Sequence, residues 1–231
     1  MTKEDLSIAD LMSGLMMVFL LIAVAFMLDV QQQKNALEEQ KNAMGEIAEM
    51  AEQSRSQLHH DLMQEFAEDL KRWNAVILKD NTVRFKAPKV LFESGKSELR
   101  PKFKAILDNF FPRYINILQD YSDEIEAIRI EGHTSSYWYD TDDVVIRYLN
   151  NMKLSQLRAL STLRYCYELD EVKDKREWLQ AMLRANGLSF AQRIFNADGS
   201  ENAEKSRRVE FKIVTKAEQK LHHILVRHLE G

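Results

Sequence analysis

The feature that most constrains this chain is an uncharged run of eighteen residues from Leu11 to Leu28. As a helix this run spans roughly 27 Å, and a start at Ile8 extends it to about 31 Å, the thickness of a bilayer core. Because a buried helix of this length normally keeps a polar face, the run predicts a transmembrane helix. A cleaved signal peptide is the alternative, since Ala23-Val24-Ala25 imitates a cleavage site, but the basic segment that precedes such signals is missing.

Asp10 stands at the start of this span, where a carboxylate costs a few kcal/mol and usually faces a protein interior or a water path. Helical spacing places Asp10 on one stripe with Ser13 and Gly14, whose small size allows another helix to approach closely. The stripe favours an ion path, although an aspartate that only caps the helix also fits. Asp29, at the other end, is interpreted as a boundary residue without a role. Lys3 before the span and Lys34 after it leave the orientation undecided by charge.

Composition excludes several classes of protein. The 231 residues include 32 Lys and Arg against 36 Asp and Glu, a balance that gives no reason to expect nucleic acid as a partner. The only cysteine, Cys166, excludes an internal disulfide, a cysteine-based zinc site and a lipid-anchored N-terminus. No nucleophile with its base, phosphate loop or dinucleotide-binding turn is recognisable, so we expect neither an enzyme nor a cofactor.

A long polar helix is expected after the span, from Gln31 to about Leu78, within a linker over residues 30–80. The segment contains one glycine and no proline, and its apolar or small residues recur in steps of three and four, as in a coiled coil. This stripe consists of Met44, Ile47, Ala51, Ser54, Leu58, Leu62, Phe66, Leu70, Trp73 and Ile77. We expect the stripe to join two parallel copies of the chain, although it can instead pack back on the domain that follows.

The pattern changes at Asn81, where short strands begin to alternate with helices. The expected strands are 82–85, 90–92, 126–131 and 207–215, and the expected helices are 99–121, 154–169, 177–185 and 216–229. In the last strand Val209, Phe211 and Ile213 share one face. The fold class is therefore an α/β sandwich (α+β) with a mixed sheet, over residues 81–231.

Four motifs in this region resemble the OmpA-like peptidoglycan-binding domain. They are Leu91-Phe92-Glu93-Ser94-Gly95-Lys96-Ser97-Glu98-Leu99, Gly132-His133-Thr134, Asn151-x-x-Leu154-Ser155-x-x-Arg158-Ala159 and Arg207-Arg208-Val209-Glu210. With the span and the Ala9-Asp10-Leu11-Met12 start, the whole chain resembles MotB-type B subunits of ion-driven stators.

The resemblance implies a function for the whole chain. Two B helices would sit within a ring of five multi-span A subunits in the bacterial inner membrane, and Asp10 would carry the proton. The N-terminus would be cytoplasmic, and the C-terminal domain would bind peptidoglycan in the periplasm. Arg158 would hold a peptide carboxylate, with Asn151 and Leu154 beside it and with Arg207 as a further contact.

Ser135 departs from the family, which has an aspartate for the peptide ammonium at that position. Asp140, Asp142 or Asp143 is expected to share that role. The Gly132–Trp138 run resembles instead the B subunits of Zorya anti-phage defence systems, which we favour over a flagellar stator. A passive envelope tether without ion transport is the remaining alternative.

The histidines and the aromatic loop have simpler interpretations. His59-His60, His222-His223 and His228 are expected to be surface residues, because adjacent histidines point to different helix faces, and no metal site is expected. His133 is interpreted as a structural hydrogen-bonding residue. Tyr137-Trp138-Tyr139 fits either a stacking platform for sugars or a hydrophobic loop cover.

Overall fold

The computed structural model describes residues 3–86 and 88–217, and the side chains of residues 11–86 and 90–217. The helix expected over 216–229 therefore lies outside the described residues, except for its first two residues. The same holds for His222, His223 and His228. The first helix, α1 (Lys3–Trp73), belongs to two compact units, one up to Met50 and the other from Ala51 onward. Each unit is described by itself.

The first unit contains the apolar run. The segment is helical throughout, and its 18-residue window has a mean hydropathy of 2.6 with none of its side chains buried. Large apolar side chains such as Leu11, Phe19 and Leu28 are more than 60% exposed. Exposed apolar side chains of this size require lipid or another helix around them. This agrees with the expected membrane span.

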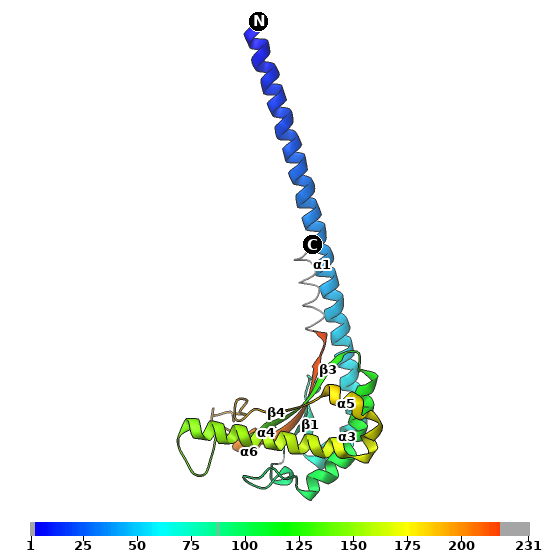
Figure 1. Ribbon diagram of the computed structural model, residues 1–231, viewed down its shortest axis with the longest axis vertical. Coiled ribbons are helices and arrows are strands. Elements are labelled where there is room, and N and C mark those ends of the chain that lie inside the picture. The colour runs from blue at the N-terminus through cyan, green and yellow to red at the C-terminus, as the bar shows by residue number, and fades with distance from the viewer. Residues whose placement is uncertain (1–2, 87, 218–231) are drawn as a thin grey trace. The chain divides into compact units, whose positions relative to one another are not determined.

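The second unit is built on a five-stranded mixed sheet with the order β1-β2-β5-β3-β4 (Figure 1). The strands are β1 (Ala75–Ile77), β2 (Val83–Phe85), β3 (Ile125–His133), β4 (Leu183–Gly187) and β5 (Arg208–Thr215). Only β3 and β4, among these strands, pair in parallel. The expected α/β sandwich is confirmed.

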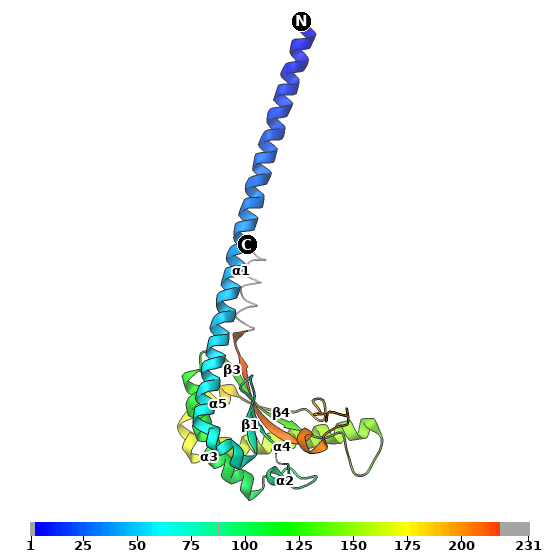
Figure 2. The same ribbon diagram turned by 180° about the vertical axis from the view of Figure 1, so that it is seen from behind.

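Within residues 3–86 and 88–217, six further helical segments accompany the sheet, which Figure 2 shows from behind. They are α2 (Pro88–Leu91), α3 (Pro101–Asp120), α4 (Val144–Glu168), η1 (Asp170–Lys175), α5 (Arg176–Met182) and α6 (Ala203–Ser206). The main helix α3 begins at Pro101, whose fixed φ suits the first helical turn. Asp143 caps α4 by accepting hydrogen bonds from the backbone N–H groups of Val145 and Ile146.

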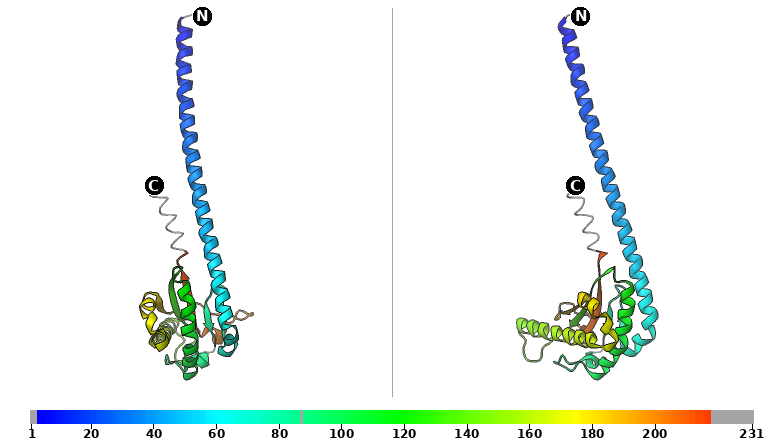
Figure 3. Two further views of the ribbon diagram at one scale, coloured as in Figure 1. Left: turned by 90° about the vertical axis from the view of Figure 1, so that its right-hand side faces the viewer. Right: turned by 45° about the vertical axis from the view of Figure 1, so that its right-hand side comes forward.

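The core lies between one face of the sheet and the helices (Figure 3). Phe110 of α3 contacts Phe85 of β2 and Phe211 of β5, with ring centroids 5.2 and 5.1 Å apart. Phe66 of α1 joins the same cluster, 5.3 Å from Phe110. Val209, Phe211 and Ile213 all face this core, as the alternation predicts.

The stripe of α1 is divided between two environments. Leu58, Leu62, Phe66 and Trp73 are buried in the core of their own domain. The expectation that the whole stripe joins two copies is therefore wrong for these residues, because the same apolar pattern is satisfied within the chain. The upstream positions, such as Met44 and Ala51, are only partly buried.

Four local predictions are also wrong. The helix expected over 154–169 begins ten residues earlier, at Val144, where Asp143 caps it. The stalk helix does not reach residue 78: Asn74, with φ of 51°, ends α1, and β1 then pairs with β2. Residues 88–91 form the short helix α2 instead of a strand. The helix expected to run to residue 185 stops at Met182, because β4 adds to the sheet beside β3.

Candidate functional site

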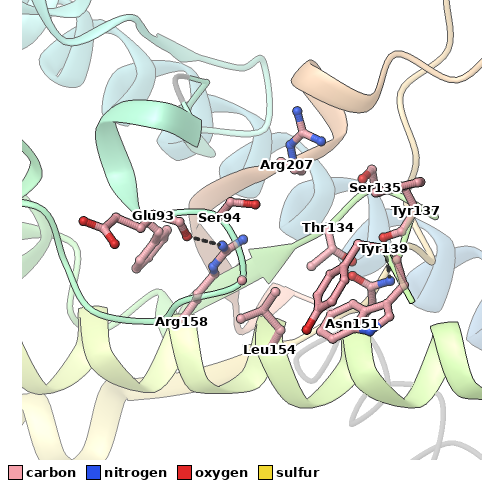
Figure 4. A pocket seen from close by; sticks show the side chains of 13 residues that line it. Glu93, Ser94, Thr134, Ser135, Tyr137, Tyr139, Asn151, Leu154, Arg158 and Arg207 are labelled. Carbon is pink, nitrogen blue, oxygen red and sulfur yellow. Dashed lines mark hydrogen bonds between the residues drawn. The ribbon is translucent and has the colours of Figure 1, made fainter. Parts of the chain in front are cut away.

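The candidate site is a pocket of about 240 Å³ at the end of β3, between α4, the loop after α2 and the start of β5 (Figure 4). It is lined by Phe92, Glu93, Ser94, Gly95, Thr134, Ser135, Tyr137, Trp138, Tyr139, Asn151, Leu154, Arg158 and Arg207. Five of the residues expected to bind peptidoglycan are among them: Ser135, Asn151, Leu154, Arg158 and Arg207. Segments far apart in sequence thus meet at one hollow.

Gly132 explains how β3 and α4 come close enough to form this pocket. A Cβ atom at Gly132 would lie 2.2 Å from the backbone oxygen of Ser155, so any other residue would push α4 away. The Ser155 hydroxyl donates to the Met152 carbonyl and accepts from the Ser189 backbone N–H, both at 2.9 Å. The Thr134 backbone N–H donates in turn to the Ser189 carbonyl at 2.8 Å. These bonds hold Thr134 and Ser135 at the pocket wall.

Arg158 fastens the loop that forms the opposite wall. Its Nε donates to the Lys96 carbonyl at 2.9 Å and its Nη2 to the Glu93 carbonyl at 3.2 Å, while the guanidinium stacks 4.9 Å above the Phe92 ring. Among the residues that the structure describes, no carboxylate forms an ion pair with Arg158, although its exposed fraction is only 8%. Guanidinium has five N–H donors, so further donors remain for a ligand.

Arg207 makes the pocket more electropositive. It lines the same hollow and is only partly buried. Burial, with a smaller repulsive contribution from Arg207, lowers the pKa of Arg158 to about 10. Two cations that share a pocket are stabilised by an anion between them, and the planar guanidinium fork suits a carboxylate. The arrangement is chemically suited to hold a carboxylate.

The acids of the pocket differ from the expectation. Asp140, Asp142 and Asp143 do not line it, and Asp143 is occupied as the cap of α4. Glu93 does line it, although its carboxylate also pairs with Lys96 at 2.6 Å. Sequence reasoning missed Glu93 as an acid of the site, even though it belongs to one of the four recognised motifs.

Asn151 and Ser135 complete the polar wall. Both are buried, with exposed fractions of 3%, and the Asn151 amide donates to the Tyr137 carbonyl at 3.3 Å, which anchors the aromatic loop to α4. Within that loop the rings of Trp138 and Tyr139 stack, with centroids 5.7 Å apart. Tyr139 is 75% exposed, so the loop presents aromatic surface at the rim of the pocket.

Asp10 lies on α1 in the first unit, at the N-terminal end of the exposed apolar run. Its side chain is outside the described residues. Ser13 and Gly14 follow it one turn later in the same helix, and a Cβ at Gly14 would have open space around it.

Comparison with known proteins agrees with both units. Residues 91–208 match the OmpA family. The Zorya protein ZorB of Escherichia coli is 43% identical over 220 residues, which cover 95% of this chain and 91% of that protein. The chain belongs to the OmpA family and, within it, to the ZorB proteins. The expected resemblance to the B subunits of Zorya systems is thereby confirmed.

A solved structure shows the same fold. A MotB-like protein from Desulfovibrio vulgaris aligns with a TM-score of 0.52 and 23% identity, covering 72% of this chain and 98% of that protein. The exposed apolar helix followed by an OmpA-family domain fits a single-pass protein of the bacterial inner membrane. The relation to ZorB extends over the apolar helix as well as the domain, since it covers nearly the whole chain.

Proposed function

We propose that this chain is the peptidoglycan-anchored B subunit of a proton-driven, stator-like motor in Zorya anti-phage defence. One observation carries the proposal: the chain combines an exposed apolar helix with a cationic pocket. It is also related to ZorB over 95% of its length. The proposal includes no enzymatic reaction. We assign residues 1–29 to membrane insertion, 30–80 to the linker and 81–231 to wall binding.

The pocket would take the charged end of a peptidoglycan stem peptide. Arg158 and Arg207 supply positive charge for a peptide carboxylate, while Asn151 and Leu154 line the same wall. Ser135 contributes no charge, so Glu93 is the acid best placed to attract an ammonium group. A domain held in this way to the rigid wall can resist the torque of a rotating partner.

The membrane helix would carry the ion path. The large apolar side chains between Leu11 and Leu28 are exposed. We assign them to contacts with lipid, with a second B helix and with five multi-span A subunits. Asp10 is then a carboxylate among packed helices, able to take a proton from one side and release it to the other. The N-terminus would be cytoplasmic and the domain periplasmic, which is the only orientation that brings the pocket to peptidoglycan.

Two substitutions test the two parts separately. Asp10→Asn keeps the size of the side chain but cannot release a proton, so we expect loss of phage protection with normal assembly and normal binding to purified sacculi. Asp29→Asn, in the same helix, is the matched control and should keep protection. Arg158→Ala should instead lose sacculus binding by tenfold or more, because one partner of a desolvated charge pair is removed.

The outcomes separate a motor from a tether. Full protection in the Asp10→Asn strain would eliminate the motor and leave a passive anchor. Unchanged sacculus binding by Arg158→Ala would show that the pocket is not the wall site. Plating efficiency of phage and co-sedimentation with sacculi are the two measurements.

A further inference from the structure

A second polar cluster lies on the face of the sheet opposite the core. In register across the strands, Arg84 of β2 pairs with Glu210 of β5, and Glu210 with Glu131 of β3. His133 follows two residues after Glu131, so its side chain projects from the same face. Glu131, His133 and Glu210 are all buried, with exposed fractions of 4%, 1% and 4%. None of these residues lines the wall-binding pocket.

The hydrogen bonds of this cluster are incomplete. One oxygen of Glu210, Oε1, accepts from both Arg84 Nε and Arg208 Nε at 2.6 Å. Its other oxygen lies 3.5 Å from His133 Nε2, and Glu131 Oε2 lies 3.6 Å from the same nitrogen. These separations exceed the usual N–H···O distance of about 2.9 Å. Both ring nitrogens of His133 and Glu131 Oε2 are buried without a hydrogen-bond partner.

Unpartnered buried polar atoms are expensive, and two of these, Glu131 Oε2 and His133 Nε2, face each other 3.6 Å apart, an arrangement that a ligand between them would satisfy. We propose that Glu131, His133 and Glu210 bind a divalent transition-metal ion of the zinc class. Ligand atoms around a tetrahedral ion with bonds of 2.0–2.1 Å lie about 3.4 Å apart. The observed 3.5 and 3.6 Å match that spacing better than they match a hydrogen bond, and the three ligand atoms all lie within 4.8 Å of one another.

The donor chemistry is consistent with this ion. The imidazole nitrogen of His133 and the carboxylate oxygens of Glu131 and Glu210 are all donor types that zinc accepts. Asn186 of β4 is the cross-strand partner of Glu131, and its Oδ1 is also buried and without a partner. It offers a further oxygen on the same face. The proposal revises the expectation that the chain has no metal site and that His133 is only a structural hydrogen-bonding residue.

The surrounding charges set the strength of the site. The carboxylate of Glu210 is already balanced by Arg84 and Arg208, which weakens its attraction for another cation. Glu131, in contrast, has no lysine or arginine in ion-pair contact within the part of the chain that the structure describes, only His133. Arg208 also attracts Glu131 electrostatically, so the two arginines and two glutamates already sum to zero charge. A divalent ion would be held by its bonds to Glu131, His133 and Glu210 against this background, and we expect a site of moderate affinity at most.

The position gives the ion a structural role next to the pocket. Arg208 Nη1 donates to the carbonyls of Gln192 and Ser206, which fastens the backbone at these two residues to β5. His133 directly precedes Thr134 and Ser135, which line the pocket. A metal that joins β3 to β5 at His133 would thus hold the end of β3 in the position that shapes the pocket wall.

The test is metal binding by the full chain, purified in detergent without a histidine tag, stripped with a chelator and titrated with Zn²⁺ or Co²⁺. We expect about one equivalent of Zn²⁺ per chain and, for Co²⁺, the intense visible absorption of a tetrahedral site. Zinc at a hundredfold excess over its dissociation constant should raise the unfolding temperature by roughly 5–10 °C.

Variants keep the test specific. Glu131→Gln preserves shape and should weaken Zn²⁺ binding at least tenfold, as should His133→Gln. His60→Gln removes an exposed histidine outside the cluster and should bind as the parent does. Equal binding by Glu131→Gln and the parent chain would overturn the proposal. Where a variant fails to fold by circular dichroism, the parent chain decides alone: if it shows neither a tetrahedral cobalt spectrum nor zinc-dependent stabilisation, the proposal is wrong.

Discussion

Replacing Arg158 with lysine tests whether the pocket recognises a carboxylate through the guanidinium fork. Arg158 has two tasks, since Nε and Nη2 hold the carbonyls of Lys96 and Glu93 while other N–H groups remain for a ligand. Lysine keeps the charge, but its single ammonium cannot reach the loop and the ligand in the same geometry. At least one charged hydrogen bond is then lost in the bound state, about 1.5–3 kcal/mol.

This loss corresponds to a ten- to roughly hundredfold weaker binding constant. The assay is a binding isotherm of the detergent-solubilised chain on purified sacculi, with folding checked by circular dichroism. Arg164→Lys is the matched control, because Arg164 lies exposed on the same helix outside the pocket, and it should bind normally. If Arg158→Lys binds sacculi as well as the parent chain, a point charge suffices and the assignment of Arg158 as a fork is wrong.

Three further predictions follow from other contacts. Trp138→Ala should weaken sacculus binding severalfold, because the partly buried Trp138 ring stacks on the exposed Tyr139 ring and supports a platform for sugar. If the loop is only a hydrophobic cover, affinity will stay unchanged and only the unfolding temperature will fall. Cysteine at Ala51 should crosslink two copies in membranes more readily than cysteine at Glu52, and equal yields would argue against a dimer contact there. Asp69→Asn should lower the free energy of unfolding by about 1–3 kcal/mol. Burial raises the pKa of the Asp69 carboxyl, but hydrogen bonds from Arg113 and Arg72 outweigh burial and hold this pKa below 3.8. The difference in unfolding free energy between Asp69→Asn and the parent chain should therefore be present above pH 3.8 and vanish as the pH falls through the lower pKa of the folded state. Urea titrations at several pH values measure this difference.

Local patterns predicted the parts of the fold whose environment depends on a short stretch of sequence. The alternation in β5 was sufficient because Val209, Phe211 and Ile213 face one continuous core. Pro101 marked the start of α3 for the same local reason. The recognised motifs also brought Arg158 and Arg207 to one pocket, since each motif occupies a fixed place in the fold.

Features that depend on partners distant in sequence were not predictable in this way. The stripe on α1 has the right period for a coiled coil and for packing on its own domain, and only the tertiary structure shows Leu58, Leu62 and Phe66 in the core. The segment Leu183–Gly187 reads as the end of a helix, yet pairing with β3 makes it a strand. The position at which α4 begins depends on Asp143, and the role of Asp143 as the helix cap is visible only from its hydrogen bonds in the structure.

The polar cluster on the far face illustrates the same limit and links the two proposed sites. Glu131 and Glu210 are 79 positions apart in the sequence, and only the register of β3 against β5 places them opposite each other. Gly132, between Glu131 and His133, allows α4 to approach on the core face. The end of β3 therefore contacts α4 on one face of the sheet, contributes to the polar cluster on the other face, and leads directly into the pocket wall. Because the three features share one strand, a change that loosens the cluster should shift Thr134 and Ser135 as well, and wall binding should respond to substitutions that never touch the pocket.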